Sequence, residues 1–289
     1  MPRVLFKNKL DSPALGFSTG NRPTQAQFVQ LNTASIQNNG LVACWPMWEP
    51  ASTPIVDICS LGLVGAMYLN WPTIASDAMF GNHPVGGGDG NGGGTMQGYR
   101  IPHNDVTDMG VNQVAGVPWA SSFWFRTLIT TNGPQDSYLQ SYCNTTAPFS
   151  GTAIGLETGN DLAHNTNGTT LTDAAFKTDD ATLFNLGWHH ILFVQVPQTP
   201  NTYNSTNVYY IDGALDRSDS GCCAVGLTTS DLWFLSNNQG DPPADGAICE
   251  YRMYRSGANL VNPTTRLALA QSLFNTATRW ELYLGNGLT

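Results

Sequence analysis

The chain carries no pair of carboxylates at the spacing that glycoside hydrolysis requires. A hydrolase of this kind needs two carboxylates facing one cleft, one as acid and one as nucleophile or base. Asp179 and Asp180 are adjacent, so they would point to opposite faces of any strand, and Glu250 stands alone. An ion pair with Arg252 or Arg255 is the expected role of Glu250. The carboxylates therefore predict no glycoside hydrolase.

Two adjacent histidines, His189 and His190, are the next residues that could do chemistry, as metal ligands or as a general base. Neighbouring residues of a strand point to opposite faces, so the two imidazoles cannot readily share one metal ion. Catalytic triads whose members lie far apart in the chain stay open at this point. On balance we expect a protein without catalytic activity.

Six cysteines occur at positions 44, 59, 143, 222, 223 and 249, without the spacing of a zinc site. Cys222 and Cys223 are adjacent, and neighbours in a strand lack the facing Cβ atoms that a disulfide needs. We expect most cysteines to be small buried thiols in a reducing compartment, with one or two disulfides as the alternative.

The elements that would position these side chains are short β-strands. Residues 187–195 and 208–213 read as two strands joined by a loop, and the second ends at Asp212-Gly213, a pair suited to positive φ. Similar short runs, separated by Gly, Pro, Asn and Asp, fill residues 40–256 and predict a two-sheet sandwich. Trp45 and Trp188 would cap the ends of that sandwich. The residues expected between the sheets are Leu41, Ala43, Phe123, Phe125, Ile191, Phe193, Val208, Tyr210, Leu232, Phe234, Ile248 and Tyr251.

One segment, residues 262–274, has a convincing helical pattern. Asn262 can cap the helix with a proline at the first helical position, and Leu267 and Phe274 recur at helical spacing. The following residues, 279–285, alternate like a strand. They would form either an edge strand of the sandwich or a docking tail.

Several of these segments resemble laminin-G-like domains of the concanavalin A type. The resemblance rests on the Trp-His-His strand at 188–190 with its Ile-Asp-Gly turn, and on strands at 40–47, 97–102, 121–126 and 246–255 in the same order. It implies an all-β, concanavalin A-like two-sheet jelly-roll sandwich with an N-terminal arm and a short C-terminal helix. The implied domains are the arm, 1–38, the laminin-G-like jelly roll, 39–258, and the C-terminal helix and tail strand, 259–289.

The resemblance also implies a calcium ion at the rim of the sandwich, held by Asp and Asn oxygens and backbone carbonyls. Asp241 and Asp245 in one loop, and Asp89 and Asn91 in another, are the candidate ligands. Solvated loop carboxylates are the alternative, because the spacing matches no ordered site such as an EF-hand. The glycine run 86–94 is no phosphate loop, because it lacks a Gly-Lys-Ser/Thr ending and a following helix.

Residues 1–38 have no counterpart in the resembling family. Residues 25–31 alternate between polar and apolar types, so this arm would either add a strand to a neighbouring molecule or pack on its own sandwich. Because the arm has a modest apolar content, we expect it to make few contacts with its own sandwich and to order against a partner.

The charge of the chain excludes some classes of partner. The net charge is −9, and there is no run of Lys or Arg, so we expect neither nucleic acid nor an anionic membrane as a partner. Charged residues are sparse at 11%, and the neutral polar surface that results suits sugar contacts or burial in a large assembly. No apolar run is long enough for a signal peptide or a membrane span.

These features together predict a non-enzymatic structural or interaction protein of a phage particle, made in the host cytoplasm. It would be a capsid decoration or tail-surface protein, whose partners are other virion proteins, its own copies or cell-surface glycans. One alternative is a carbohydrate-binding, lectin-like adhesin module that is not tied to a virion. The second alternative, a glycoside hydrolase of the same fold, is disfavoured by the carboxylates.

Overall fold

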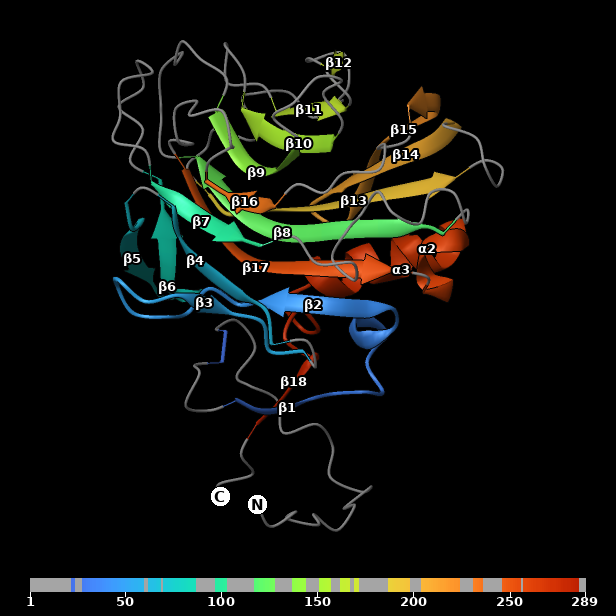
Figure 1. Cartoon of the computed structure of the whole chain (residues 1–289). Helices are drawn as coiled ribbons and strands as arrows, with labels where there is room; N and C mark the ends of the chain where they lie inside the picture. The colour runs from blue at the N-terminus through green and yellow to red at the C-terminus, as the bar shows by residue number, and fades with distance from the viewer. Residues whose placement is uncertain are drawn as a thin grey trace.

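The computed structural model shows an all-β molecule in which two antiparallel sheets form a sandwich, with helix α3 (Pro263–Phe274) against the first sheet (Figure 1). This is the predicted fold class. Short helices η1 (Ile36–Asn38) and α2 (Ala258–Val261) lie outside the sheets. The structure describes residues 22–23, 28–59, 62–68, 70–86, 97–102, 117–127, 137–143, 151–156, 162–166, 169–171, 187–197, 204–223, 231–235, 246–255 and 257–285.

Sheet I has eight strands in the order β15-β14-β13-β8-β17-β6-β5, with β2 also paired to β17. The predicted hairpin is present, since β13 and β14 pair antiparallel and the chain turns at Asp212-Gly213, where both φ angles are positive. The strands of sheet I are β2 (Leu41–Trp45), β5 (Thr73–Asp77), β6 (Gly81–Val85), β8 (Trp119–Thr127), β13 (His189–Pro197), β14 (Asn204–Ile211), β15 (Ala214–Cys223) and β17 (Gly246–Arg255).

Sheet II also has eight strands, in the order β12-β11-β10-β9-β16-β7-β4-β3. Strand β7 is the segment predicted at 97–102. The strands of sheet II are β3 (Ile55–Val56), β4 (Val64–Tyr68), β7 (Gly98–Ile101), β9 (Ser137–Cys143), β10 (Gly151–Leu156), β11 (Leu162–Thr166), β12 (Thr169–Leu171) and β16 (Leu232–Phe234).

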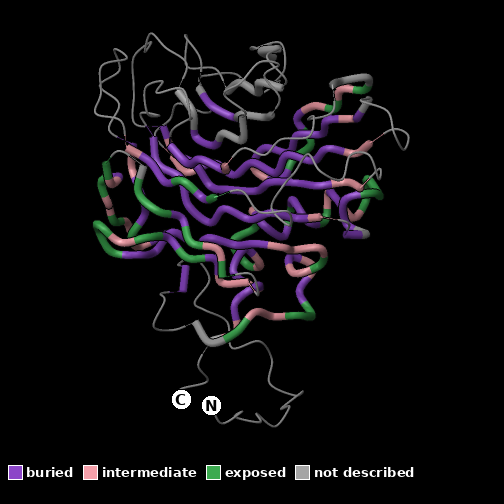
Figure 2. Tube along the Cα trace, viewed as in Figure 1, coloured by how far each residue is buried: buried purple, intermediate pink, exposed green. Residues whose placement is uncertain are grey.

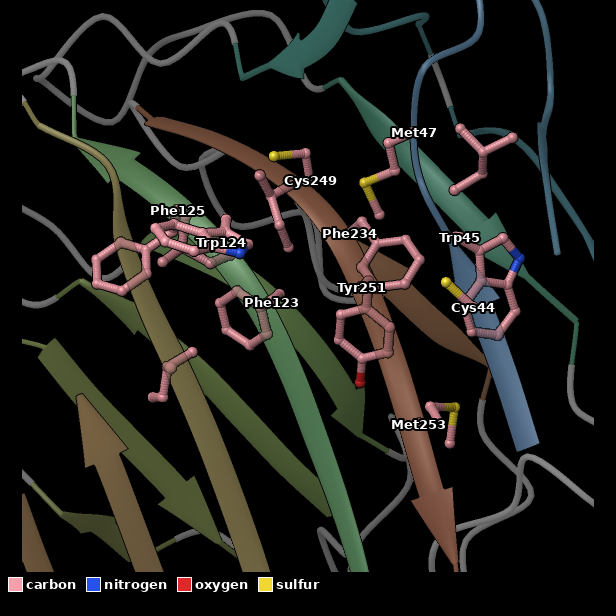
Figure 3. Close-up of a cluster of buried hydrophobic side chains, with 14 of the residues drawn as sticks. Cys44, Trp45, Met47, Phe123, Trp124, Phe125, Phe234, Cys249, Tyr251 and Met253 are labelled. Atoms are coloured by element: carbon pink, nitrogen blue, oxygen red, sulfur yellow. The ribbon is translucent and has the colours of Figure 1, made fainter. Parts of the chain in front are cut away.

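An aromatic cluster fills the space between the two sheets (Figure 3). Phe123 of β8 stacks on Tyr251 of β17 with ring centroids 5.7 Å apart, and Phe234 of sheet II meets Tyr251 at 4.5 Å. Trp45 lies 6.0 Å from both Phe234 and Tyr251 and is completely buried. The prediction that Trp45 caps an end of the sandwich is therefore wrong, whereas Trp188 lies half-buried just before β13. Each buried ring stabilises the fold by roughly 1.5–3 kcal/mol.

A second apolar layer lies on the other face of sheet I, beneath α3, so that the central strands are buried along most of their length (Figure 2). Val208 and Tyr210 belong to this layer, and the prediction that they face sheet II is wrong. Their neighbours Tyr209 and Ile211 take the inner positions, because strand residues alternate between faces. The members of this layer are Ala120, Leu192, Val194, Val208, Tyr210, Tyr254, Leu260, Leu269, Ala270 and Leu273.

Helix α3 begins where the sequence predicts. Asn262 Oδ1 accepts a hydrogen bond from the backbone N–H of Thr264 at 2.8 Å, which satisfies one of the free donors of the first turn. Leu269 and Leu273 form its buried face. Leu267 and Phe274, which the sequence pattern placed there, are only half-buried.

The described residues before Gly40 are part of the folded molecule. Strand β1 (Phe28–Leu31) pairs antiparallel with β18 (Tyr283–Gly285) in a separate two-stranded sheet below the sandwich (Figure 1). The buried Gln37 amide donates to the carbonyls of Ser272 and Thr278 at 3.0 and 2.8 Å. The prediction that the arm makes few contacts with its own sandwich is therefore wrong for its described residues.

A buried cluster of charges, which we call the closing cluster, joins both chain ends to β17. Glu250 lies in a bulge of β17 with a φ of 55°, and its carboxylate is 3.3 Å from Arg22 Nη1 and 3.1 Å from Arg252 Nη2. The Tyr283 hydroxyl donates to Glu250 Oε2 at 2.5 Å, and Arg252 Nη1 donates to Gln37 Oε1 at 2.7 Å. The predicted ion pair between Glu250 and Arg252 is confirmed, but it is buried.

Candidate functional site

A row of polar side chains crosses the inner face of sheet I, and we call Trp119, Gln195, Asn207 and Asp219 the inner polar row. The ladders of β8, β13, β14 and β15 place these four residues directly beside one another. They face sheet II, because Phe193 and Tyr209, two residues away on the same strands, belong to the core between the sheets.

Hydrogen bonds fix the orientation of the two amides in the row. Trp119 Nε1 donates to Gln195 Oε1 at 3.1 Å, and Gln195 Nε2 donates to Asn207 Oδ1 at 3.0 Å. The Ser205 hydroxyl donates to the same Asn207 oxygen at 3.2 Å. The Asn207 amide nitrogen is thereby left as a buried donor that has no partner in the described part of the chain. Leaving such a donor unpaired costs roughly 1–3 kcal/mol, so a ligand that supplied an acceptor would recover this free energy on binding.

Two aromatic rings, Phe193 and Tyr209, support the row from the neighbouring positions. Phe193 lies 5.1 Å from Trp119 in an edge-on arrangement and 5.1 Å from Tyr209 in a stacked one. Such packing restricts the rotamers of the side chains in the row, so that their polar groups are held in place.

The outer end of the row is charged and accessible. Arg217 Nε lies 2.5 Å from Asp219 Oδ2, and the two side chains are 26% and 21% exposed. The pair neutralises itself, while the carboxylate and guanidinium still offer acceptors and donors to a neighbouring molecule. The row thus combines a buried floor of amides and a ring with a half-exposed rim.

This arrangement suits the binding of a polar, hydroxyl-rich ligand rather than proton transfer. It has one carboxylate, already ion-paired, and among the described residues no second carboxylate lies beside it in the row as hydrolysis would need. Oriented amides, an ion pair and aromatic rings are the groups with which binding sites fix a polar ligand. The row was missed by the sequence analysis, although Gln195 and Asn207 interrupt an otherwise apolar inner pattern in β13 and β14.

The predicted calcium ligands Asp89, Asn91, Asp241 and Asp245 lie outside the described residues. Within the described ranges, no group of three or more His, Cys, Asp or Glu side chains could hold a metal ion. The sequence motif at residues 16–20, Gly-Phe-Ser-Thr-Gly, has the spacing of a hydrolase nucleophile elbow and also lies outside them.

The two adjacent histidines point to opposite faces, as predicted. His189 Nδ1 lies 2.7 Å from Asp212 Oδ2, and His190 Nε2 lies 2.8 Å from Ser122 Oγ. Burial, reinforced by Arg252, lowers the pKa of His190 to about 3, so its imidazole is neutral. Both side chains therefore hold strands together.

Three of the cysteines have described side chains, and all three are free thiols: Cys44, Cys59 and Cys249. Burial raises the pKa of Cys44 to about 12 and that of Cys249 well above its ordinary value, which makes both poor nucleophiles. The side chains of Cys222 and Cys223 lie outside the described set, so their predicted lack of a mutual disulfide stays a prediction.

No protein-family model matches the chain, and no curated protein matches it in sequence. The jelly-roll sandwich expected from the laminin-G-like motifs is confirmed, while membership of that family stays a prediction. In the described part of the chain, no helix is long and apolar enough to cross a membrane.

Solved structures of similar fold are toxin binding domains. The binding domain of paraclostridial mosquitocidal protein 1 matches with a TM-score of 0.56 and 14% identity, over 84% of this chain and 53% of that chain. The binding domain of botulinum neurotoxin DC in complex with rat synaptotagmin II matches with a TM-score of 0.56 and 14% identity, over 84% and 52%. The same domain in complex with SialylT has a TM-score of 0.53 and 14% identity, over 83% and 52%. The chain thus spans about half the length of these structures, and the likeness establishes the shared fold.

Proposed function

We propose that the chain is a carbohydrate-binding module whose ligand seats against the inner polar row. The observation that carries the proposal is the Asn207 amide, which is buried, held in one orientation by Gln195 and Ser205, and left with a donor that no described residue pairs. The half-exposed Arg217–Asp219 pair extends the site outward. Hydroxyl groups of a sugar act as both donors and acceptors, so they complement amide, carboxylate and guanidinium groups together.

The fold gives independent support. One matched structure, with a TM-score of 0.55 and 14% identity, is described in terms of cell entry of botulinum neurotoxin type C through two ganglioside molecules, and another is a complex with SialylT. Those ligands belong to those toxins. Several of the matched structures are described as receptor-binding or binding domains, which agrees with a binding role and not with hydrolysis for this chain.

Glycan-array binding followed by calorimetry tests the proposal. We expect Asp219→Ala to weaken binding of the best glycan by roughly 10-fold or more, since a hydrogen bond to a charged group contributes about 1.5–3 kcal/mol. Asn207→Asp, which replaces the donor with an acceptor, should do the same. Asp231→Ala is the matched control, because Asp231 pairs with Arg100 on sheet II. Absence of any bound glycan, or equal weakening by Asp219→Ala and Asp231→Ala, would contradict the proposal.

We propose separately, on the sequence features alone, that a phage particle carries this module. The partners would then be other virion proteins or further copies of the chain, besides the glycan. Mass spectrometry of purified particles tests this point, and a chain found only outside particles would refute it without affecting the proposed sugar binding.

A further inference from the structure

Arg126 forms a second polar feature at the far end of β8, on the face of sheet I opposite the inner polar row. Its guanidinium carbon lies 5.1 Å from the centre of the Trp188 ring, and the side chain is 23% exposed. Seven residues separate it from Trp119 along β8, which corresponds to about 23 Å. The even and odd positions of the strand place the two on opposite faces. This feature is therefore distinct from the site proposed above.

The groups around Arg126 are already committed to other partners. His83 Nδ1 lies 2.9 Å from the Gly81 carbonyl, so it carries the proton, and His83 Nε2 is the acceptor for Arg126 Nη2 at 3.4 Å. Burial lowers the pKa of His83, which keeps this tautomer neutral. Trp188 Nε1 donates to Asp77 Oδ2 at 2.7 Å.

Asp77 contributes charge but no close hydrogen bond to Arg126. Asp77 Oδ1 accepts hydrogen bonds from the backbone N–H groups of Met79 and Phe80 at 2.9 and 2.8 Å. Although burial alone would raise the pKa of Asp77, these bonds and the Trp188 indole lower it below its ordinary value, so the carboxylate is ionised. Arg126 Nη1 remains 3.8 Å from Asp77 Oδ2, beyond hydrogen-bond distance.

Within the described part of the chain, Arg126 therefore has N–H donors that no partner satisfies. A guanidinium has five N–H donors, and among the described residues Arg126 makes one hydrogen bond, the 3.4 Å contact with His83. Its Nε is buried and has no partner among the described residues. Arg100 provides the contrast, because it also lies over a tryptophan, Trp233 at 5.5 Å, but its Nε contacts Asp231.

We propose that Arg126, packed over the ring of Trp188, binds the carboxylate of an acidic sugar. A carboxylate fits the guanidinium fork with two parallel hydrogen bonds, and it would satisfy the buried Nε together with one terminal nitrogen. The carboxylate follows from the geometry of Arg126, whereas the sugar part rests on the proposed function. Asp77 lies beside the fork, so it repels a second negative charge and favours a singly charged ligand.

Nuclear magnetic resonance titrations of the full chain test this inference at low salt, with sodium glucuronate, sodium acetate and glucose as probes. The indole N–H signal of Trp188, assigned by Trp188→Phe, should move with glucuronate and not with glucose. Arg126→Gln should weaken the glucuronate response at least 10-fold, and Arg126→Lys should weaken it partly. Arg100→Gln is the matched control and should leave the response unchanged.

The outcomes separate the carboxylate site from the sugar part of the inference and from the proposed function. An equal response of wild-type protein to glucose and glucuronate, or none to either, overturns the carboxylate site even if Arg126→Gln proves unstable. Acetate binding without glucuronate binding overturns the sugar part and leaves a simple carboxylate site. Neutral glycans that bind in an Asp219-dependent way keep the proposed function whatever Arg126 does. A glucuronate response lost in Arg126→Gln supports the inference even if the inner polar row binds nothing.

Discussion

Glu250 is the residue at which the two ends of the chain meet. Glu250→Gln keeps the shape of the side chain but removes the charge that balances Arg22 and Arg252 in a buried position. Breaking a buried ion pair from one side costs roughly 3–5 kcal/mol. We expect the free energy of unfolding, measured by urea titration, to fall by about that amount. Glu281→Gln, which alters a half-buried contact with Ser35, should cost much less, and equal losses would contradict this role.

His190 makes the stability depend on pH. Its pKa is lowered to about 3 by burial in the folded protein and returns to its ordinary value of 6.5 in the unfolded chain. Between these values the unfolded state binds a proton that the folded state does not, so stability falls as the pH is lowered through this window. The slope approaches about 1.4 kcal/mol per pH unit for this one group.

Urea titrations between about pH 5 and 7 on wild-type protein and His190→Gln test this effect, because most carboxylates titrate below that range and His83, whose pKa burial also lowers, is present in both proteins. Wild-type protein should lose more stability on acidification than His190→Gln. Parallel pH profiles for the two proteins would show that His190 is not the group responsible.

At the scale of the element, the turn between β14 and β15 depends on Gly213. Its φ is +76°, and a Cβ added there would lie 3.2 Å from Phe274 Cβ, so the turn also packs against α3. We expect Gly213→Ala to cost roughly 1–2 kcal/mol, from left-handed backbone strain and from this close approach. Gly81→Ala is the control, since Gly81 has a φ of +62° with nothing within 4 Å of the added atom. If calorimetric melting temperatures fall equally in both variants, the packing against α3 contributes nothing.

At the scale of the whole molecule, the sandwich is closed by segments from both ends of the chain. The β1–β18 pair lies below sheet I, on the far side from β10 to β12 (Figure 1). Arg22 and Gln37 supply two members of the closing cluster, and their loss would remove the Arg22 charge beside Glu250 and the acceptor that Gln37 offers to Arg252.

Deletion of residues 1–38 should therefore unfold or aggregate the protein. Deletion of residues 1–20 keeps the contacts described for Arg22 and Gln37, so it should lower the melting temperature much less than deletion of residues 1–38. Circular dichroism melts of both shortened chains check this expectation. A stable, cooperatively melting chain that begins at residue 39 would show that the closing cluster is dispensable.

The sequence alone determined the class of fold and several of its strands. The strands at 40–47, 97–102, 121–126, 187–195 and 246–255 all appear, because short apolar runs bounded by turn residues are local signals. The cap of α3 and the turn at Asp212-Gly213 are likewise encoded by single residues with strong conformational preferences.

Only the tertiary structure decided whether a given face of a sheet I strand packs against sheet II or against α3. Val208 and Tyr210 could not be assigned correctly from sequence, because sheet I is apolar on both faces and the pattern does not say which face α3 covers. The inner polar row, the closing cluster and Arg126 on Trp188 each join residues far apart in the chain. Such groupings depend on strand order and register, which arise from packing between distant segments and leave no local pattern in the sequence.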